Sequence, residues 1–595
     1  MTARVPLLLA LCLCAACPSS GPATCATVRD CAQAERCVAG KCAASSTALG
    51  SIGDSCASGS ECASGLGCSA SSAGFPSGAC TQDCGSGSCP GGSACADLRS
   101  SATAAQLCAP SCSSDSQCRQ GYLCCQAQGN VCLPSALCVP PVLNVTCNAP
   151  TLVSKGTVVG HDTAPSGCVK PVQPSSLPGA QVLSKGTHTV GEKITFDVPA
   201  GTGSVTLVEQ AVNASASVVY QGSVLENSVL ADNITFPDGG VIFKDTGAPN
   251  DPSTVQVFYG GGSPSTGAQT LPNAAPLLSQ VAAAGALPAG TWSFNVSDYA
   301  FECTASGSGC TDGGTAANTY DVKVLLKPGS GTSAGTLDMA FYIVTSTGLT
   351  SALAPSNPAV QRMVSTLASF YKQGGVCLGE VDFWDVPSWA RSRYGTGIDA
   401  DDTGPCSNLD QMLTLSQPGN KLDLFLVQSI SATPQGGGTV VGIDGTIPGP
   451  ATIGGTVHSG AAVSMANLTA TGCGTNISLS SCGADNVAYI AAHEGGHYLG
   501  LFHTTELDGE YFDPLTDTGK CSCESCAPVS QQSSCATPTK TTPPAQPTIV
   551  EAPSCNAGAC AGADDLMFWQ LNDSVSKGRL TAQQGQVMRQ NPAVK

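Results

Sequence analysis

Three of the six histidines in this sequence fall within the eleven-residue run HEGGHYLGLFH. His493 and His497 are four residues apart, so on a helix both imidazoles project from one face and can bind one metal ion. Gly500 stands where the chain must leave the helix and turn sharply, and this helix-breaking turn brings His503 round as a third ligand. Glu494 follows the first ligand and can face a water molecule on the metal. The spacing therefore predicts a metal centre with an adjacent carboxylate.

The ligand set indicates the chemistry of this centre. Three neutral ligands leave a fourth position open for water, which is typical of a catalytic rather than a structural zinc site. Zinc lowers the pKa of that water towards neutral, and Glu494 is placed to take its proton as the water attacks a carbonyl carbon. The alternative is three histidines with satisfied hydrogen bonds on an ordinary buried helix. A chance match to HExxHxxGxxH is on the order of one in a million, so we expect Zn²⁺ as cofactor.

The extended motif is that of the metzincin clan of zinc peptidases, and flanking segments strengthen the resemblance. Metzincins carry a methionine-containing turn below the metal, and Met567 in ADDLMFW matches this structural Met-turn. HTTE and FDPLTDT, after His503, resemble the pappalysin-like branch. The resemblance implies a zinc endopeptidase with Glu494 as general base and a protein or peptide as substrate. Relatives often have Tyr two residues after the methionine; Trp569 stands there instead, and an indole donates but cannot ionise.

Residues 334–595 are expected to form the α/β (α+β) catalytic domain that positions the motif. TLDMAFYIVTS, LGEVDFWDV and LDLFLVQSI are strand-like, and NPAVQRMVSTLASFYKQGG spaces its apolar residues as a helix does. GAAVSMANL predicts a short edge strand. NVAYIAAHEGGHYLGLF predicts the active-site helix, with Asp485 or Asn486 as its cap. The order of these elements resembles the upper lobe of metzincins. Two glycines inside the helix lower its intrinsic stability, which indicates that something else fixes this segment.

Two groups of acidic residues offer a weaker hypothesis of a second metal. The groups are Asp399, Asp401 and Asp402 in IDADDTG, and the pair Asp513 and Asp517. Carboxylates are calcium ligands, but neither group matches a full calcium-loop pattern. A solvated loop is therefore favoured over a calcium site, and calcium stays an unsupported second cofactor.

The cysteine content indicates an extracytoplasmic location. The 595-residue chain has 35 cysteines, a density that reducing compartments do not favour. Residues 1–17 have the shape of a signal peptide, in which Arg4 precedes the apolar run VPLLLALCLCAAC. Its ending LCAAC resembles a bacterial lipoprotein signal, although Cys14 replaces the usual Leu; lipidated Cys17 would then anchor the protein to a membrane. An ordinary cleaved signal is the alternative. We expect an outer-membrane lipoprotein or a secreted protein.

More than half of the cysteines lie in residues 25–147. The spacing C-x5-C-x5-C recurs there, at Cys25/Cys31/Cys37, Cys56/Cys62/Cys68 and Cys112/Cys118/Cys124. Aromatic residues are almost absent, so the segment cannot build a core and disulfides must stabilise it. We predict small disulfide-rich modules, with zinc binding as the alternative. Disulfides are likewise favoured over a metal for CSCESC, that is Cys521, Cys523 and Cys526.

Residues 148–330 contain short β-rich runs between turns, such as KITFDVPA, SVTLVEQAV and YDVKVLLKP, which predict a β-sandwich. The predicted fold is therefore multidomain: disulfide-rich modules, then a β-sandwich, then a metzincin-like catalytic domain. A net charge of -18 argues against nucleic acid as a partner. A surface adhesion or scaffold protein with a vestigial peptidase fold is the alternative function. The complete His-Glu-His-His set argues against it.

The lipoprotein signal gives a direct test. Native protein with lipidated Cys17 should partition into detergent, because more than one acyl chain anchors a protein stably. Cys17→Ser should move it to the aqueous phase, as followed by detergent phase separation. Recovery of the native protein as soluble material cleaved elsewhere would contradict the lipoprotein signal and leave export intact.

Overall fold

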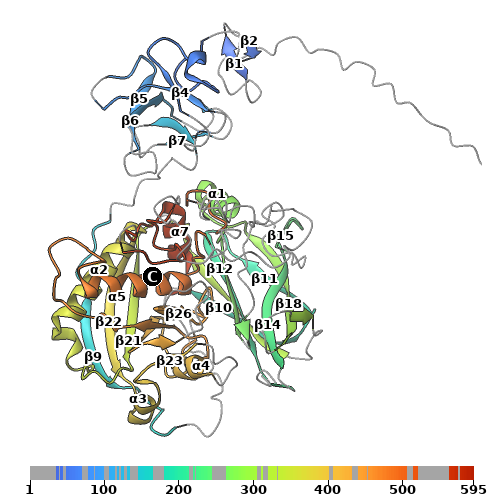
Figure 1. Cartoon of the computed structure of the whole chain (residues 1–595). Helices are drawn as coiled ribbons and strands as arrows, with labels where there is room; N and C mark the ends of the chain where they lie inside the picture. Colours follow the sequence, from blue (N-terminus) through green and yellow to red (C-terminus); the bar gives the residue numbers. More distant parts are fainter. Residues whose placement is uncertain are drawn as a thin grey trace, which may run out of the picture. The chain divides into compact units, whose positions relative to one another are not determined.

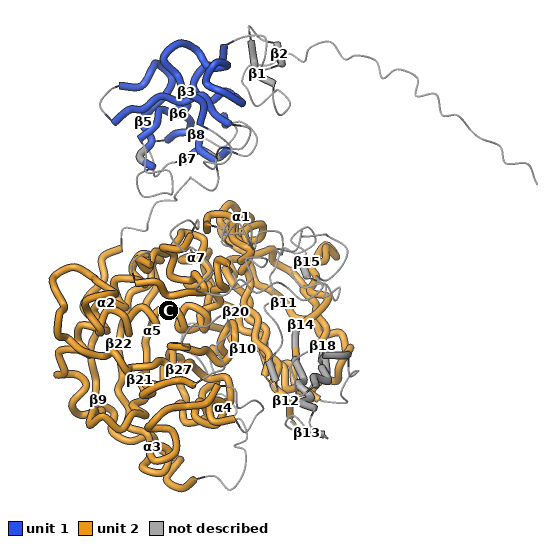
Figure 2. Tube along the Cα trace, viewed as in Figure 1, with its two compact units in different colours: residues 1–140 blue, residues 141–595 orange. Residues whose placement is uncertain are grey.

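The computed structural model describes part of the chain, which forms two compact units, residues 1–140 and 141–595 (Figure 2). The described residues are 35–38, 41–44, 49–69, 75, 78–85, 88–98, 106–113, 117–118, 122–125, 130–134, 145–164, 180–212, 219–220, 223–243, 263–264, 266–304, 310–312, 319–331, 333–400, 407–431, 440–451, 453–505, 513–519, 562–573 and 576–595. The signal segment 1–17 with Cys17, the cysteines of CSCESC, and Asp401 and Asp402 lie outside them. No described helix has the length and apolar character needed to cross a membrane.

The first unit is a series of short β-hairpins held by disulfides. The hairpins are β1 (Glu35–Val38) with β2 (Lys41–Ala44), β3 (Gly67–Ser69) with β4 (Ala79–Thr81), β5 (Ser93–Asp97) with β6 (Gln106–Pro110), and β7 (Tyr122–Cys125) with β8 (Val131–Pro134). A 3-10 turn, η3 (Gly59–Glu61), precedes β3. In each of the last three hairpins a cysteine of one strand lies opposite a cysteine of the other, as in Cys68 and Cys80.

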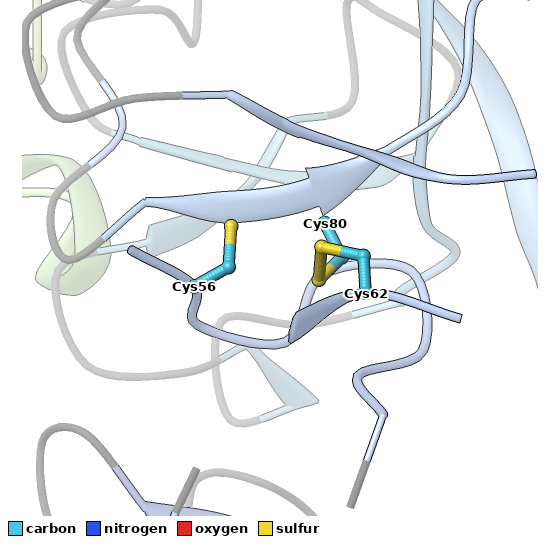
Figure 3. A group of neighbouring side chains, drawn as sticks. All are labelled: Cys56, Cys62 and Cys80. Atoms are coloured by element: carbon cyan, nitrogen blue, oxygen red, sulfur yellow. A yellow bond between two sulfur atoms is a disulfide. The ribbon is translucent and has the colours of Figure 1, made fainter. Parts of the chain in front are cut away.

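These opposed cysteines do not bond to each other. In each module two disulfides interleave, so that the second begins between the two cysteines of the first: Cys56–Cys68 and Cys62–Cys80, Cys84–Cys95 and Cys89–Cys108, Cys112–Cys124 and Cys118–Cys132. Figure 3 shows the Cys62–Cys80 bond with Cys56 beside it. The described cysteine clusters that are compact enough for a metal consist of sulfur atoms already bonded to sulfur. Zinc binding by these modules is therefore excluded in the described residues.

Two antiparallel sheets form a sandwich within the second unit (Figure 1). The four-stranded sheet has the order β10 (Gln181–Thr189), β20 (Thr319–Pro328), β12 (Thr202–Ala211) and β17 (Thr266–Leu271). The other has the order β11 (Lys193–Val198), β18 (Gly290–Thr304), β14 (Ser223–Thr235) and β13 (Val219–Tyr220), with β15 (Val241–Phe243) and β16 (Ser263–Pro264) on β14 and β19 (Cys310–Asp312) on β18. Residues of β11 alternate between exposed and buried, as a strand with one solvated face requires.

The sandwich packs against the remainder of the second unit. Helix α1 (Ala275–Ala284) inserts Leu278 into the core of the domain that carries the histidines. The amide of Ala275 donates to the Pro514 carbonyl. On the outer face of the four-stranded sheet, Val208 and two neighbouring side chains pack against Ile453. The sandwich and the domain that carries the histidines therefore share buried apolar surface.

A six-stranded sheet forms the centre of the histidine-bearing domain. Its order is β26 (Gly442–Asp444), β27 (Ala461–Ser464), β24 (Leu422–Val427), β21 (Gly335–Ile343), β22 (Val376–Asp385) and β9 (Thr151–Thr157), and only the β26–β27 pair is antiparallel. Helices α2 (Pro358–Gln373), α3 (Ser388–Tyr394), α4 (Asn408–Leu413), α5 (Gly483–Tyr498) and α7 (Ala582–Gln590) surround it, with the 3-10 turn η7 (Ala354–Ser356) and the short pair β23 (Ile398–Asp399) and β25 (Ile430–Ser431).

Three expectations differ from this arrangement. Strand β9, expected in the sandwich, is parallel to β22, and the Cys147–Cys377 disulfide holds the chain beside that strand. GAAVSMANL, which contains β27, is not the edge strand, because β27 pairs on both sides; the edge is β26, in the Gly-rich segment that precedes GAAVSMANL. Helix α5 begins at Gly483 without a side-chain cap. Asp485 instead lies buried and pairs with Arg362 at 2.7 Å, so its carboxylate joins α5 to α2.

A buried carboxyl group inside the sandwich links stability to pH. Glu209 is fully buried on β12 between the core residues Leu207 and Ala211, and neither side-chain oxygen has a hydrogen-bond partner. Burial raises the pKa of Glu209 to about 8. In an unfolded chain the pKa is about 4.3. The folded state therefore retains a proton that the unfolded state loses, and the contribution of this group to stability falls as pH rises through this window.

Glu209→Gln should remove this decrease in stability at high pH, because an amide does not ionise. We expect the variant to be more stable than the wild type at pH 9, with little difference at pH 4. Thermal unfolding of both proteins at the two pH values measures the effect. A difference in melting temperature that is the same at pH 4 and pH 9 would contradict a neutral, buried Glu209.

Candidate metal centre

The three predicted histidines meet at one point. The Nε2 atom of His503 lies 3.2 Å from Nε2 of His493 and 3.2 Å from Nε2 of His497. Nδ1 of His493 lies 2.7 Å from the Leu566 carbonyl oxygen, and Nδ1 of His497 lies 2.7 Å from that of Leu501. A carbonyl only accepts, so each of these Nδ1 atoms carries the hydrogen and leaves the Nε2 lone pair free. The donor set fits one divalent cation.

Burial fixes the protonation state of the first two ligands. It lowers the pKa of His493 to about 3, with the neighbouring His503 adding to the effect. It also holds the pKa of His497 well below its usual range, helped by His503 and His493. Both rings are therefore neutral at neutral pH, which is the form that binds a metal.

Gly500 makes the chain reversal that brings His503 to the site. Its φ is 101°, in a region that L side chains rarely adopt. The Gly500 amide donates to the His497 carbonyl, and the Leu501 amide donates to the Gly496 carbonyl. These bonds close the last turn of α5 and place the Leu501 carbonyl against His497. The turn thus orients one ligand and delivers another.

The two glycines within the motif allow α5 to pass between close neighbours. A Cβ at Gly495 would collide with the hydroxyl of Tyr371 on α2, which donates to the Ala492 carbonyl. A Cβ at Gly496 would lie 2.6 Å from Sδ of Met567. Close packing on two sides fixes this part of the helix, and it accounts for residues that intrinsic helix propensity disfavours.

Met567 is fully buried and lies in a turn that is hydrogen-bonded to both arms of the motif. Its carbonyl accepts from the Thr504 amide, and its amide donates to Oδ1 of Asp565. The Tyr489 hydroxyl donates to the Asp565 carbonyl at 3.0 Å. The adjacent Leu566 carbonyl is the one that accepts from His493. The turn therefore supports the ligand geometry through main-chain atoms as well as packing, which the sequence did not indicate.

Glu494 lies beside the ligands and against the edge strand. It is 7% exposed, and a Cβ at Gly442 on β26 would collide with its Oε1. Within the described residues, the group of atoms placed to share a metal contains the three histidines and not Glu494. Burial raises the pKa of Glu494 well above its usual range, and Asp444 on β26 adds to this. Glu494 is thus placed next to the ligands without being one. Sequence reasoning missed Gly442 and Asp444.

The acidic pair considered for calcium has protein partners. Both side chains are buried, not in a solvated loop. Asp517 accepts from the Thr581 hydroxyl and the Gln583 amide, at the start of α7. Asp513 accepts from the Thr518 hydroxyl. A carboxylate at a helix N-terminus satisfies free amides, so the position of Asp517 has a structural explanation. Asp399, from the other acidic group, lies on the short strand β23.

Comparisons with known proteins add little to this geometry. No family model matches the chain, and no curated protein matches it. Among solved structures, the chain is similar to metalloproteinase-II from Bacteroides fragilis, with 15% sequence identity and a TM-score of 0.18. The match covers 31% of this chain and spans 50% of that protein.

The crowding of α5 can be tested at Gly495. Gly495→Ala should destabilise the protein by about 1–3 kcal/mol through overpacking, although alanine is the better helix former. Tyr371→Phe removes the hydroxyl that the new methyl group would meet, so the double variant should regain part of the loss. Denaturant unfolding of the four proteins gives the coupling free energy. Gly474→Ala is the control, because a Cβ there would meet no atom within 4 Å. Additive effects of Gly495→Ala and Tyr371→Phe would contradict a contact between position 495 and the Tyr371 hydroxyl.

Proposed function

We propose that this chain is an exported zinc-dependent endopeptidase of the metzincin type, with Glu494 as general base. The observation that carries the proposal is the convergence of three imidazole nitrogens beside a buried carboxylate that does not belong to the ligand cluster. Three ligands leave room for a reacting group, whereas structural zinc sites use four protein ligands. This combination supports hydrolysis rather than a purely structural role.

The chemistry of the donor set favours zinc. His493, His497 and His503 would hold it through Nε2, and neutral imidazole nitrogens suit zinc far better than calcium or magnesium. When bound, zinc supplies a Lewis acid at the reacting carbonyl and acidifies water. The main-chain acceptors at Leu566 and Leu501 fix two of the rings, so these ligands need little rearrangement on binding.

Glu494 performs the proton transfers in this proposal. Its carboxylate takes a proton from the attacking water and delivers it to the nitrogen of the leaving amine. Its buried position supports this role, because a carboxylate shielded from solvent is a stronger base than one in water. Strand β26 runs past Glu494 and pairs only with β27 among the described strands. A peptide can add to such an edge in extended form.

The disulfides support the export of the protein. The described cysteines of residues 56–132 and the Cys147–Cys377 pair are oxidised, as expected outside a reducing compartment. Together with residues 1–17, this supports an outer-membrane lipoprotein or a secreted enzyme.

Substitutions at the site separate base from ligand. Glu494→Gln keeps the size and the three imidazoles, so the variant should fold and still carry zinc when the metal is supplied at saturating concentration. Turnover of an unfolded protein substrate should fall by at least ~10²–10⁴, the contribution of a positioned general base. His503→Ala removes a ligand, so zinc content and activity should fall together, and added zinc should restore part of the activity. Wild-type turnover by zinc-loaded Glu494→Gln would refute this mechanism.

A further inference from the structure

The metal centre has a charge imbalance that its ligands cannot correct. A divalent cation on three neutral imidazoles brings two positive charges into a buried environment, and such charge is costly without a nearby opposite charge. With the cation bound, the ionised form of Glu494 would supply one negative charge next to the site. A second carboxylate close by would complete the compensation.

Asp444 occupies the position that this requires. It ends strand β26, where it pairs with Ala461 of β27. Residues two apart on a strand point to the same face, so the Asp444 side chain extends to the side on which Gly442 meets Glu494. Its carboxyl accepts from the backbone amides of Asp444 and Thr446, whereas the Oδ2 atom is buried and has no hydrogen-bond partner. A buried oxygen without a partner is unusual, and it lies on the face of β26 that borders the site.

The electrostatic neighbours of Asp444 are site residues. Burial raises the pKa of Asp444 to about 6, and the interaction with His503 acts in the opposite direction. Asp444 in turn contributes to the raised pKa of Glu494. At this site, the atoms close enough to share a metal belong to the three histidines, so Asp444 stands outside the ligand set.

We propose that Asp444 is the outer counter-charge of the metal centre, a positioning residue that raises the affinity of the three histidines for a divalent cation without binding it directly. This inference rests on the metal site of the proposed function. It also explains the unpartnered oxygen: without the cation, Asp444 and Glu494 place two buried acids side by side, and with the cation both have an opposite charge. Asp444 therefore opposes folding of the metal-free protein and favours metal binding.

Asp444→Asn tests both effects together. It keeps the size and removes the charge, so the metal-free variant should unfold at an equal or higher temperature than the metal-free wild type. Its affinity for zinc should fall about 10–100-fold, the usual effect of losing an outer-sphere carboxylate. Competition against a fluorescent zinc chelator measures the affinity without reference to activity. Asp444→Glu, which keeps the charge, should retain most of the wild-type affinity.

Glu209→Gln is the control for replacing a buried carboxyl by an amide far from the site, because Glu209 lies in the core of the sandwich. It should leave zinc affinity unchanged. Should Asp444→Asn fail to fold, Asp444→Ser serves as a second neutral variant in the same titration.

The outcomes separate this inference from the peptidase function. Equal zinc affinity in folded wild type and Asp444→Asn overturns the role of Asp444 and leaves the peptidase function standing. Weaker binding by Asp444→Asn, in a wild-type protein that binds zinc but hydrolyses no peptide, supports Asp444 and removes the peptidase function. A wild-type protein that binds zinc no better than His503→Ala overturns both.

Discussion

The metal centre depends on the close approach of α5 to its neighbours at Gly495 and Gly496. Tyr371 of α2 and Met567 of the downstream turn occupy the space where side chains at these positions would stand. A helix held this closely cannot rotate, so two histidines on one of its faces have fixed directions. The same crowding brings the Leu566 carbonyl within reach of His493. Packing, rather than helix propensity, thus sets the geometry of the first two ligands.

Charge is arranged in two different ways along the same helix. Near its start, Asp485 is fully buried but accepts from Arg362, Thr366 and the Ser478 amide, and these bonds lower its pKa despite burial. At the site, no described lysine or arginine pairs with Glu494, and burial raises its pKa. A buried carboxylate with full compensation anchors α5 to α2, whereas one without compensation is available for a cation or a proton. Two buried carboxyl groups on α5 thus differ in their role: Asp485 attaches the helix to α2, whereas Glu494 can interact with a cation or a proton.

The site could be read from the sequence only where its residues are local. His493, Glu494, His497 and His503 lie in one helix and one turn, so spacing alone predicted how they would meet. The periodicity of α2 is similarly local. Strand β26 came from a Gly-rich stretch without a strand pattern, and its place beside Glu494 depends on the fold of the whole sheet. Asp485 was predicted to be a helix cap from its local position. Its actual partner, Arg362, is distant in sequence, so the local pattern could not reveal the pair. The disulfide pairing of the modules was equally undetermined, since spacing does not fix connectivity.

The sandwich contacts the segment that connects β26 to β27, beside the histidine cluster. The chain between β26 and β27 carries Ile453, which packs into the outer face of the sandwich beside Val208. A few residues earlier, the Gly449 amide donates to the Tyr498 carbonyl at the end of α5. The connection is therefore held by the sandwich at one point and by the active-site helix at another. Strand β26 begins this connection, so the position of its side chains relative to Glu494 depends on both contacts. The sandwich thus helps to hold strand β26 in place beside Glu494.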